Sequence, residues 1–69
     1  MIKYKIDVLS SLKEKGYNTN KLRKEKILGE STIQQLRENK IVSWTNIDRL
    51  CNLLACQVGD IVEHVKDQD

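Results

Sequence analysis

The residues best suited to specific recognition lie in the short segment "GESTIQQLREN", residues 29–39. Its only large apolar residues, Ile33 and Leu36, lie three apart and therefore share one face of a helix. At about 100° per residue, the side chains that fall opposite this pair are Ser31, Gln34, Gln35 and Glu38. Hydroxyl and amide groups both donate and accept hydrogen bonds. Such a surface either recognises a partner or simply solvates the helix, and periodicity alone does not choose between these interpretations.

The charge of the chain is distributed unevenly along the sequence. Residues 1–40 hold ten Lys and Arg against five Asp and Glu (net +5), whereas residues 41–69 hold two against five (net −3). The basic half contains the glutamine-bearing segment, and a basic surface attracts polyanions. Because the total charge is only +2, charge alone is a weak indication of a polyanionic partner.

Catalytic or metal-binding chemistry has little support in the sequence. His64 is the only histidine, and no glycine-rich phosphate loop is present. Cys51 and Cys56 have a C-x4-C spacing that matches no redox or zinc signature, so we expect buried free thiols in a reducing, cytoplasmic setting. We therefore expect a protein that is not an enzyme, with no catalytic residue, no metal and no cofactor.

Length and composition predict a single all-α domain spanning residues 1–69. The chain is 39% apolar and 32% charged, with no proline and three glycines, which favours helices joined by tight connections. No apolar run approaches the ~18 residues of a membrane span, and no signal peptide is recognisable, so we expect no membrane association. The core is expected within about residues 4–65, followed by a C-terminal tail that frays.

Hydrophobic periodicity predicts three helices in the first half of the chain. The first spans about residues 4–15 and ends at Gly16, which can adopt the left-handed conformation. The second spans about residues 19–27, with Thr19 as its N-cap. The third spans about residues 30–38 and contains the polar surface described above.

Two further helices are predicted in the second half. Ser43 is the expected N-cap of the fourth helix, whose apolar stripe consists of Trp44, Ile47, Leu50, Cys51 and Leu54. Trp44 is therefore assigned to the core or to a plug over the preceding loop. The short fifth helix carries Val58, Ile61, Val62 and Val65.

The order and spacing of these helices resemble a known DNA-binding family. The segment "TNKLRKEKILGESTIQQLRENK" resembles the helix-turn-helix of the lambda-repressor-like (Cro/repressor, XRE-type) family, and "IDRLCNLLACQVGDIVE" resembles its two downstream helices in the small single-domain bacterial branch. The resemblance covers about residues 4–65 and implies a five-helix bundle with the helix-turn-helix at helices two and three. The chain departs from the family at the turn, where Ile27 and Gly29 stand in place of the usual Gly and Ser. Arg23 stands where Ala is common.

The resemblance implies that helix 30–38 enters the major groove of double-stranded DNA. The side chains suited to base edges there are Glu30, Ser31, Gln34 and Gln35. Glutamine can pair with adenine, serine serves most bases, and a carboxylate can accept from the amino group of cytosine. Phosphate contacts are expected at the start of the second helix and around the third, from Asn18, Thr19, Asn20, Thr32 and Lys40.

The resulting prediction is a sequence-specific transcriptional regulator, a repressor, that binds DNA as a homodimer because two half-sites multiply the specificity of one short helix. Ile61, Val62 and Val65 are the candidate dimer interface, since they exceed what a short helix can bury against one bundle. The alternative is a protein-interaction module on the same scaffold, such as an antirepressor or an antitoxin-like partner.

Overall fold

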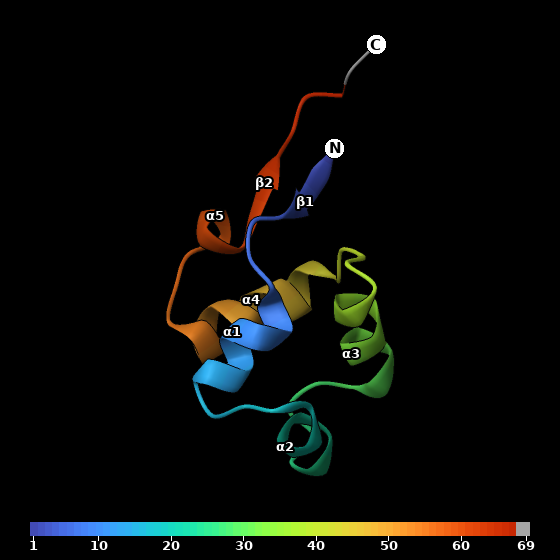
Figure 1. Ribbon diagram of the computed structural model, residues 1–69, viewed down its shortest axis with the longest axis vertical. Helices are drawn as coiled ribbons and strands as arrows, with labels where there is room; N and C mark the ends of the chain where they lie inside the picture. Colours follow the sequence, from blue (N-terminus) through green and yellow to red (C-terminus); the bar gives the residue numbers. More distant parts are fainter. Residues whose placement is uncertain (68–69) are drawn as a thin grey trace.

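The computed structural model describes residues 1–67 and contains, in that range, five helices and one two-stranded sheet. In chain order the elements are β1 (Ile2–Tyr4), α1 (Val8–Glu14), α2 (Thr19–Lys24), α3 (Glu30–Arg37), α4 (Trp44–Leu54), α5 (Val58–Ile61) and β2 (Val62–His64). Figure 1 shows α1 and α4 at the centre, with α2 at the end of the molecule opposite the β1–β2 ribbon. No helix within the described residues is long and apolar enough to cross a membrane.

Side-chain caps determine where three of the helices begin. Asp7 accepts a hydrogen bond from the Ser10 amide (3.1 Å), so α1 begins at Val8 rather than at residue 4. Asn18 accepts from the Lys21 amide (2.8 Å), so Asn18 and not Thr19 is the N-cap of α2. The predicted cap of α4 is confirmed, since the Ser43 hydroxyl accepts from the Asn46 amide at 3.3 Å.

The first four helices end in the same way. A residue with left-handed backbone conformation follows each helix, and the amide of the next residue donates a hydrogen bond to a carbonyl of the last turn. The left-handed residues are Gly16 (φ 93), Lys26 (φ 54), Asn39 (φ 59) and Ala55 (φ 53). The amides of the next residues reach back to helix carbonyls in the pairs Tyr17–Leu12, Ile27–Leu22, Lys40–Gln35 and Cys56–Cys51, at 2.8 to 3.1 Å. This Schellman arrangement provides partners for carbonyls that the helix itself leaves free.

The turn of the helix-turn-helix follows the same rule and corrects one expectation. Helix α2 ends at Lys24 rather than at residue 27. The left-handed residue of the turn is Lys26, Ile27 is half-buried, and Gly29 is the extended N-cap of α3 at φ −73. The expected third helix is confirmed to within one residue.

The core consists of apolar side chains from every helix and from the connections between them. The fully buried ones are Leu12, Leu22, Leu28, Ile33, Ile47, Leu50 and Ile61. Trp44 does not join them, because it is the first residue of α4 and 74% of it is exposed. The assignment of Trp44 to the core or to a plug over the loop was wrong. Trp44 fits the apolar repeat of α4, but the core does not extend to this first residue of the helix.

The β1–β2 ribbon is the main feature that periodicity missed. The strands are antiparallel, with Ile2 opposite His64, Lys3 opposite Glu63, and Tyr4 opposite Val62. The five expected helices are confirmed in number and order, but residues 62–64 form a strand rather than continuing the fifth helix. Because this pairing joins opposite ends of the sequence, no local pattern predicts it.

The ribbon also overturns the predicted dimer interface. Ile61 and Val62 are buried within a single copy of the chain, and Val65 is half-buried with its amide bonded to the Met1 carbonyl at 2.7 Å. The predicted fraying of the tail concerns residues 66–69, of which 68–69 lie outside the described residues.

Truncation of the central stripe tests the core. Leu50→Ala or Ile47→Ala should lower the free energy of unfolding by roughly 2–5 kcal/mol, because each leaves a cavity beneath α4. Val58→Ala, at an exposed apolar site, should change it by less than about 0.5 kcal/mol. Urea denaturation measures all three variants, and equal losses at buried and exposed sites would contradict this core.

The helix ends give an independent test. Ala55→Gly should raise the free energy of unfolding by roughly 0.5–1 kcal/mol, because glycine relieves the left-handed strain at φ 53. Gly16→Ala should lower it by about 1–2 kcal/mol from backbone strain alone, since an added Cβ would meet no atom within 4 Å. Opposite shifts in thermal midpoint are therefore expected, and shifts of the same sign would refute the proposed endings.

Candidate nucleic-acid interface

Three side chains hold α3 against the rest of the protein. Ile33 and Leu36 are buried as expected, and Thr32 is buried beside them. The Thr32 hydroxyl accepts a hydrogen bond from the side-chain amide of Asn46 on α4, at 3.1 Å. The buried face is therefore wider than the apolar pair alone, and its centre lies closer to Thr32.

This wider buried face rotates the outward surface of α3. Ser31 and Gln34 are exposed, together with Glu38 just past the helix end. Gln35 is half-buried and belongs to the flank of the surface rather than to its centre. Of the predicted base-reading residues, Glu30, Ser31 and Gln34 are thus exposed, and Gln35 alone is half-buried.

Hydrogen bonds tie the polar side chains of this surface to one another. The Gln34 amide nitrogen donates to the Glu38 carboxylate at 2.7 Å, and Arg37 donates to the Gln34 amide oxygen at 3.5 Å. The Lys40 ammonium lies 3.1 Å from the other Glu38 oxygen. The hydrogen bond from Gln34, and then the contact with Lys40, lower the pKa of Glu38 below its usual value. The carboxylate is therefore ionised at neutral pH and partly neutralised by Lys40.

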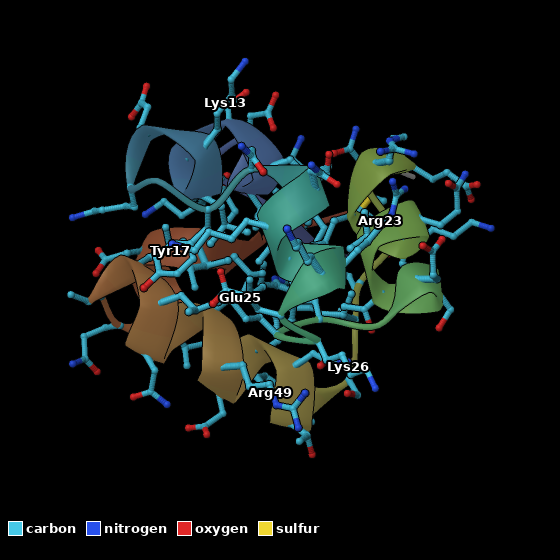
Figure 2. The ribbon with its side chains drawn as sticks, turned by 90° about the horizontal axis from the view of Figure 1, so that it is seen from below. Lys13, Tyr17, Arg23, Glu25, Lys26 and Arg49 are labelled. Atoms are coloured by element: carbon cyan, nitrogen blue, oxygen red, sulfur yellow. The ribbon has the colours of Figure 1, made fainter. Side chains whose placement is uncertain are left out.

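The amino-terminal end of α3 is linked to α2 by an ion pair. Arg23 Nε lies 2.9 Å from the carboxylate of Glu30, and Figure 2 shows Arg23 on the side of α2 nearest α3. Glu30 itself is exposed. Arg23, which departs from the usual Ala, thus bridges the two helices with a long side chain instead of packing between them. An exposed pair of this kind adds little stability, but it places a cation beside the helix start.

The predicted phosphate-contacting residues divide into two groups. Asn18, Thr19 and Asn20 lie together at the start of α2, where Asn18 and Asn20 are exposed and Thr19 is half-buried. Lys40 lies just past α3 and is exposed. Thr32 is apart from both, since its buried hydroxyl is bonded to Asn46 and offers little surface to a phosphate.

Two residues near the interface were not identified from the sequence. Arg49 on α4 donates to the carbonyl of Ile27 at 3.5 Å, and Figure 2 shows Arg49 and Lys26 on the same side of the molecule, near the turn between α2 and α3. Tyr4 on β1 donates its hydroxyl to the Lys40 carbonyl at 2.8 Å and accepts from the Val42 amide at 3.2 Å. Tertiary contacts alone reveal the role of Tyr4 in holding the loop after α3.

The cysteines are placed at a helix end rather than at a reactive site. Cys51 and Cys56 are free and half-buried, and the Cys56 amide closes the end of α4 on the Cys51 carbonyl. Burial, more than any neighbouring charge, raises the pKa of the Cys56 thiol. Within residues 1–67, no three His, Cys, Asp or Glu side chains are grouped so as to hold a metal ion.

Comparison with known proteins identifies one family. Residues 5–67 match the model of the Cro/C1-type HTH DNA-binding domain. This range contains all five helices and β2, and therefore the whole candidate interface. The chain matches no curated protein and no solved structure in the corresponding searches.

Tyr4 supplies a test of the loop that follows α3. Tyr4→Phe should lower the free energy of unfolding by about 1–3 kcal/mol at neutral pH, because the partly buried Val42 amide loses its acceptor. Burial, opposed in part by the Val42 amide, raises the pKa of Tyr4 above 10.0. The unfolded chain therefore releases this proton first, and the associated stability is complete below pH 10 and lost as pH rises through the folded pKa.

Tyr4→Phe should remove that alkaline loss, whereas Tyr17→Phe, which retains Tyr4, should keep it. Denaturant midpoints measured from pH 8 to pH 11 compare the two variants. An undiminished alkaline loss in Tyr4→Phe would show that the Tyr4 hydroxyl does not hold this loop.

Proposed function

We propose that this chain, which belongs to the family of Cro/C1-type helix-turn-helix DNA-binding domains, binds specific double-stranded DNA sites through α3 and represses transcription by occupying promoters. The observation that carries the proposal is the polar outward surface of α3. Its hydrogen-bonding side chains project from a helix whose opposite face is held by Thr32, Ile33 and Leu36. A rigidly held helix can present side chains to base edges in one register.

Ser31 and Gln34 are the central base-reading residues of this proposal. A glutamine amide can make two hydrogen bonds to adenine, and a serine hydroxyl can serve as donor or acceptor. To do so, Gln34 exchanges its bond to Glu38 for a bond to a base. Gln35 contacts a base from the edge of this surface. Glu30, at the start of α3, accepts a hydrogen bond from a cytosine amino group.

Phosphate contacts fix the protein on the duplex from two sides of α3. Asn18, Thr19 and Asn20 approach one stretch of the DNA backbone from the start of α2, because the first amide groups of a helix have no partners within the helix. Lys40 approaches another from beyond the end of α3. Thr32 contributes by holding α3 on α4 through its bond to Asn46.

Two copies are proposed to bind DNA together. Repression then requires only that they occupy the promoter. One helix of eight residues covers only a few base pairs, so paired half-sites provide the specificity that a genome demands. A protein seated on a promoter excludes other proteins from the same DNA, whereas activation would require an additional contact with the transcription machinery.

Alanine variants distinguish side chains that contact bases from side chains that contact phosphates. Sites are first selected from random duplexes. Gln34→Ala or Ser31→Ala should then weaken binding to the selected site by about 1–3 kcal/mol while barely changing binding to random DNA. A smaller effect in the same direction is expected for Gln35→Ala, on the flank. Full discrimination in all three variants would mean that this surface only solvates the helix.

Lys40→Ala should weaken both kinds of binding and reduce the magnitude of the salt slope by about one. Because this change also frees the Glu38 carboxylate, the double variant Glu38→Ala, Lys40→Ala is the matched control. The DNA affinity of the double variant shows the loss of the Lys40 phosphate contact without the added repulsion from an unpaired Glu38 carboxylate.

A salt titration distinguishes the DNA-binding proposal from the alternative of a protein-interaction module. About five phosphate contacts should give a slope of log affinity against log salt near −4.5. A negligible affinity for duplex DNA, with no dependence on salt, would favour the protein-interaction module.

A further inference from the structure

An ion pair links the two helices of the helix-turn-helix at the start of α3. Arg23 Nε on α2 lies 2.9 Å from Oε1 of Glu30, the first residue of α3. Figure 2 shows Arg23 extending from α2 toward α3. We propose that Arg23 is a positioning residue for base recognition, an inference that rests on the proposed function. Arg23 holds the Glu30 carboxylate where it accepts a hydrogen bond from one cytosine, and thereby determines specificity at that base pair.

The two partners of this ion pair are not equally free to move. The side chain of Arg23 is 41% exposed, whereas the side chain of Glu30 is 78% exposed. Arg23 follows Leu22, which is completely buried and fixes α2 on the core. Arg23 is therefore the anchored partner of the pair, and Glu30 is the partner that remains open to a base.

Open space adjoins the start of α3 on the side of this pair. A hollow of about 350 Å³ is lined there by Arg23, Lys26, Leu28, Gly29 and Glu30. An added Cβ on Gly29 would meet no atom within 4 Å. Without Arg23, the long side chain of Glu30 can therefore turn into this space and away from a base. The ion pair removes such orientations, so less conformational freedom is lost when the carboxylate meets DNA.

The contact with Arg23 leaves Glu30 able to accept a second hydrogen bond. Arg23 engages one carboxylate oxygen, and both oxygens of a carboxylate accept hydrogen bonds. In the major groove cytosine presents an amino donor, whereas guanine presents two acceptors and thymine presents one, which a carboxylate repels. Adenine places an acceptor beside its amino group. A carboxylate held in one position therefore selects cytosine over the other three bases.

The charge of Arg23 also offsets the repulsion that would oppose this contact. Phosphates give DNA a high density of negative charge, which repels a bare carboxylate. The guanidinium of arginine is always protonated in proteins, so the Arg23–Glu30 pair brings no net charge to the groove. Because an exposed ion pair contributes little to folding, the effect of Arg23 should appear in DNA specificity rather than in stability.

Affinities for single-base variants of a selected duplex test this proposal. The base pair that Glu30 reads is the one at which wild-type protein prefers cytosine and Glu30→Ala does not. The wild-type preference there should be about 5-fold to 150-fold, the range for one good base contact. Arg23→Ala should reduce this preference at least about fivefold. Discrimination at the base pairs identified by Ser31→Ala and Gln34→Ala should stay unchanged.

Two further variants separate positioning from other roles of a cation. In the double variant Arg23→Ala, Glu30→Ala, the preference should be no lower than in Glu30→Ala alone, because Arg23 acts through Glu30. Lys24→Ala removes an exposed cation one residue later on α2, about 100° around the helix, and should leave the preference unchanged. Both alanine substitutions on α2 lie at exposed helical positions, which alanine favours, so these variants fold.

Other outcomes overturn the proposal. An unchanged preference in Arg23→Ala would show that the ion pair plays no part in recognition, and equal losses on selected and random DNA would make Arg23 a phosphate contact. Reduced discrimination at the base pairs of Ser31 and Gln34 as well would mean that Arg23 holds the whole helix. If Glu30→Ala changes no preference, the inference fails while the proposed function stands through Ser31 and Gln34. If no duplex is selected at all, the proposed function fails and the inference fails with it.

Discussion

Burial of one face of α3 is the constraint on which the arrangement of the other parts depends. Ile33 and Leu36 enter the core, and Thr32 is bonded to Asn46 of α4. Since a helix of two turns has no independent stability, its orientation follows from this contact rather than from its own sequence preferences. The polar side chains on the opposite face are presented in one direction because the buried face cannot rotate.

Electrostatics on the outward face of α3 are more balanced than the basic first half of the chain implies. Each of its two carboxylates has a basic partner, Arg23 beside Glu30 and Lys40 beside Glu38. These pairs reduce the repulsion that a bare carboxylate would exert on phosphate. They also mean that Lys40 and Gln34 have partners already, so binding DNA exchanges contacts instead of creating them from solvent.

The β1–β2 ribbon connects the two ends of the chain to the loop after α3. Tyr4 pairs with Val62 across the ribbon, and its hydroxyl reaches the loop at Lys40 and Val42. Packing of the ribbon and geometry of the loop are therefore coupled through one side chain. The exposed apolar side chains of Ile2, Ile41 and Trp44 lie at the same junction, where β1, the loop and the start of α4 meet.

Local sequence determined the helices and most of the core. Periodicity identified five helices in order, together with buried residues such as Ile33, Ile47 and Leu50, because a repeat of 3.6 residues is a property of neighbours along the chain. The segment carrying Ser31 and Gln34 was likewise identifiable, since residue type and spacing decide which side chains share a face.

Only the tertiary structure decided the ribbon, the exposure of Trp44 and the partners of the polar residues. Strand pairing joins Ile2 to His64 across nearly the whole chain, and no local pattern encodes such a contact. Trp44 fits the helical stripe but lies beyond the edge of the core, because the extent of a core depends on what packs over it. Gln35 was moved to the flank by the burial of Thr32, which depends on a bond to another helix.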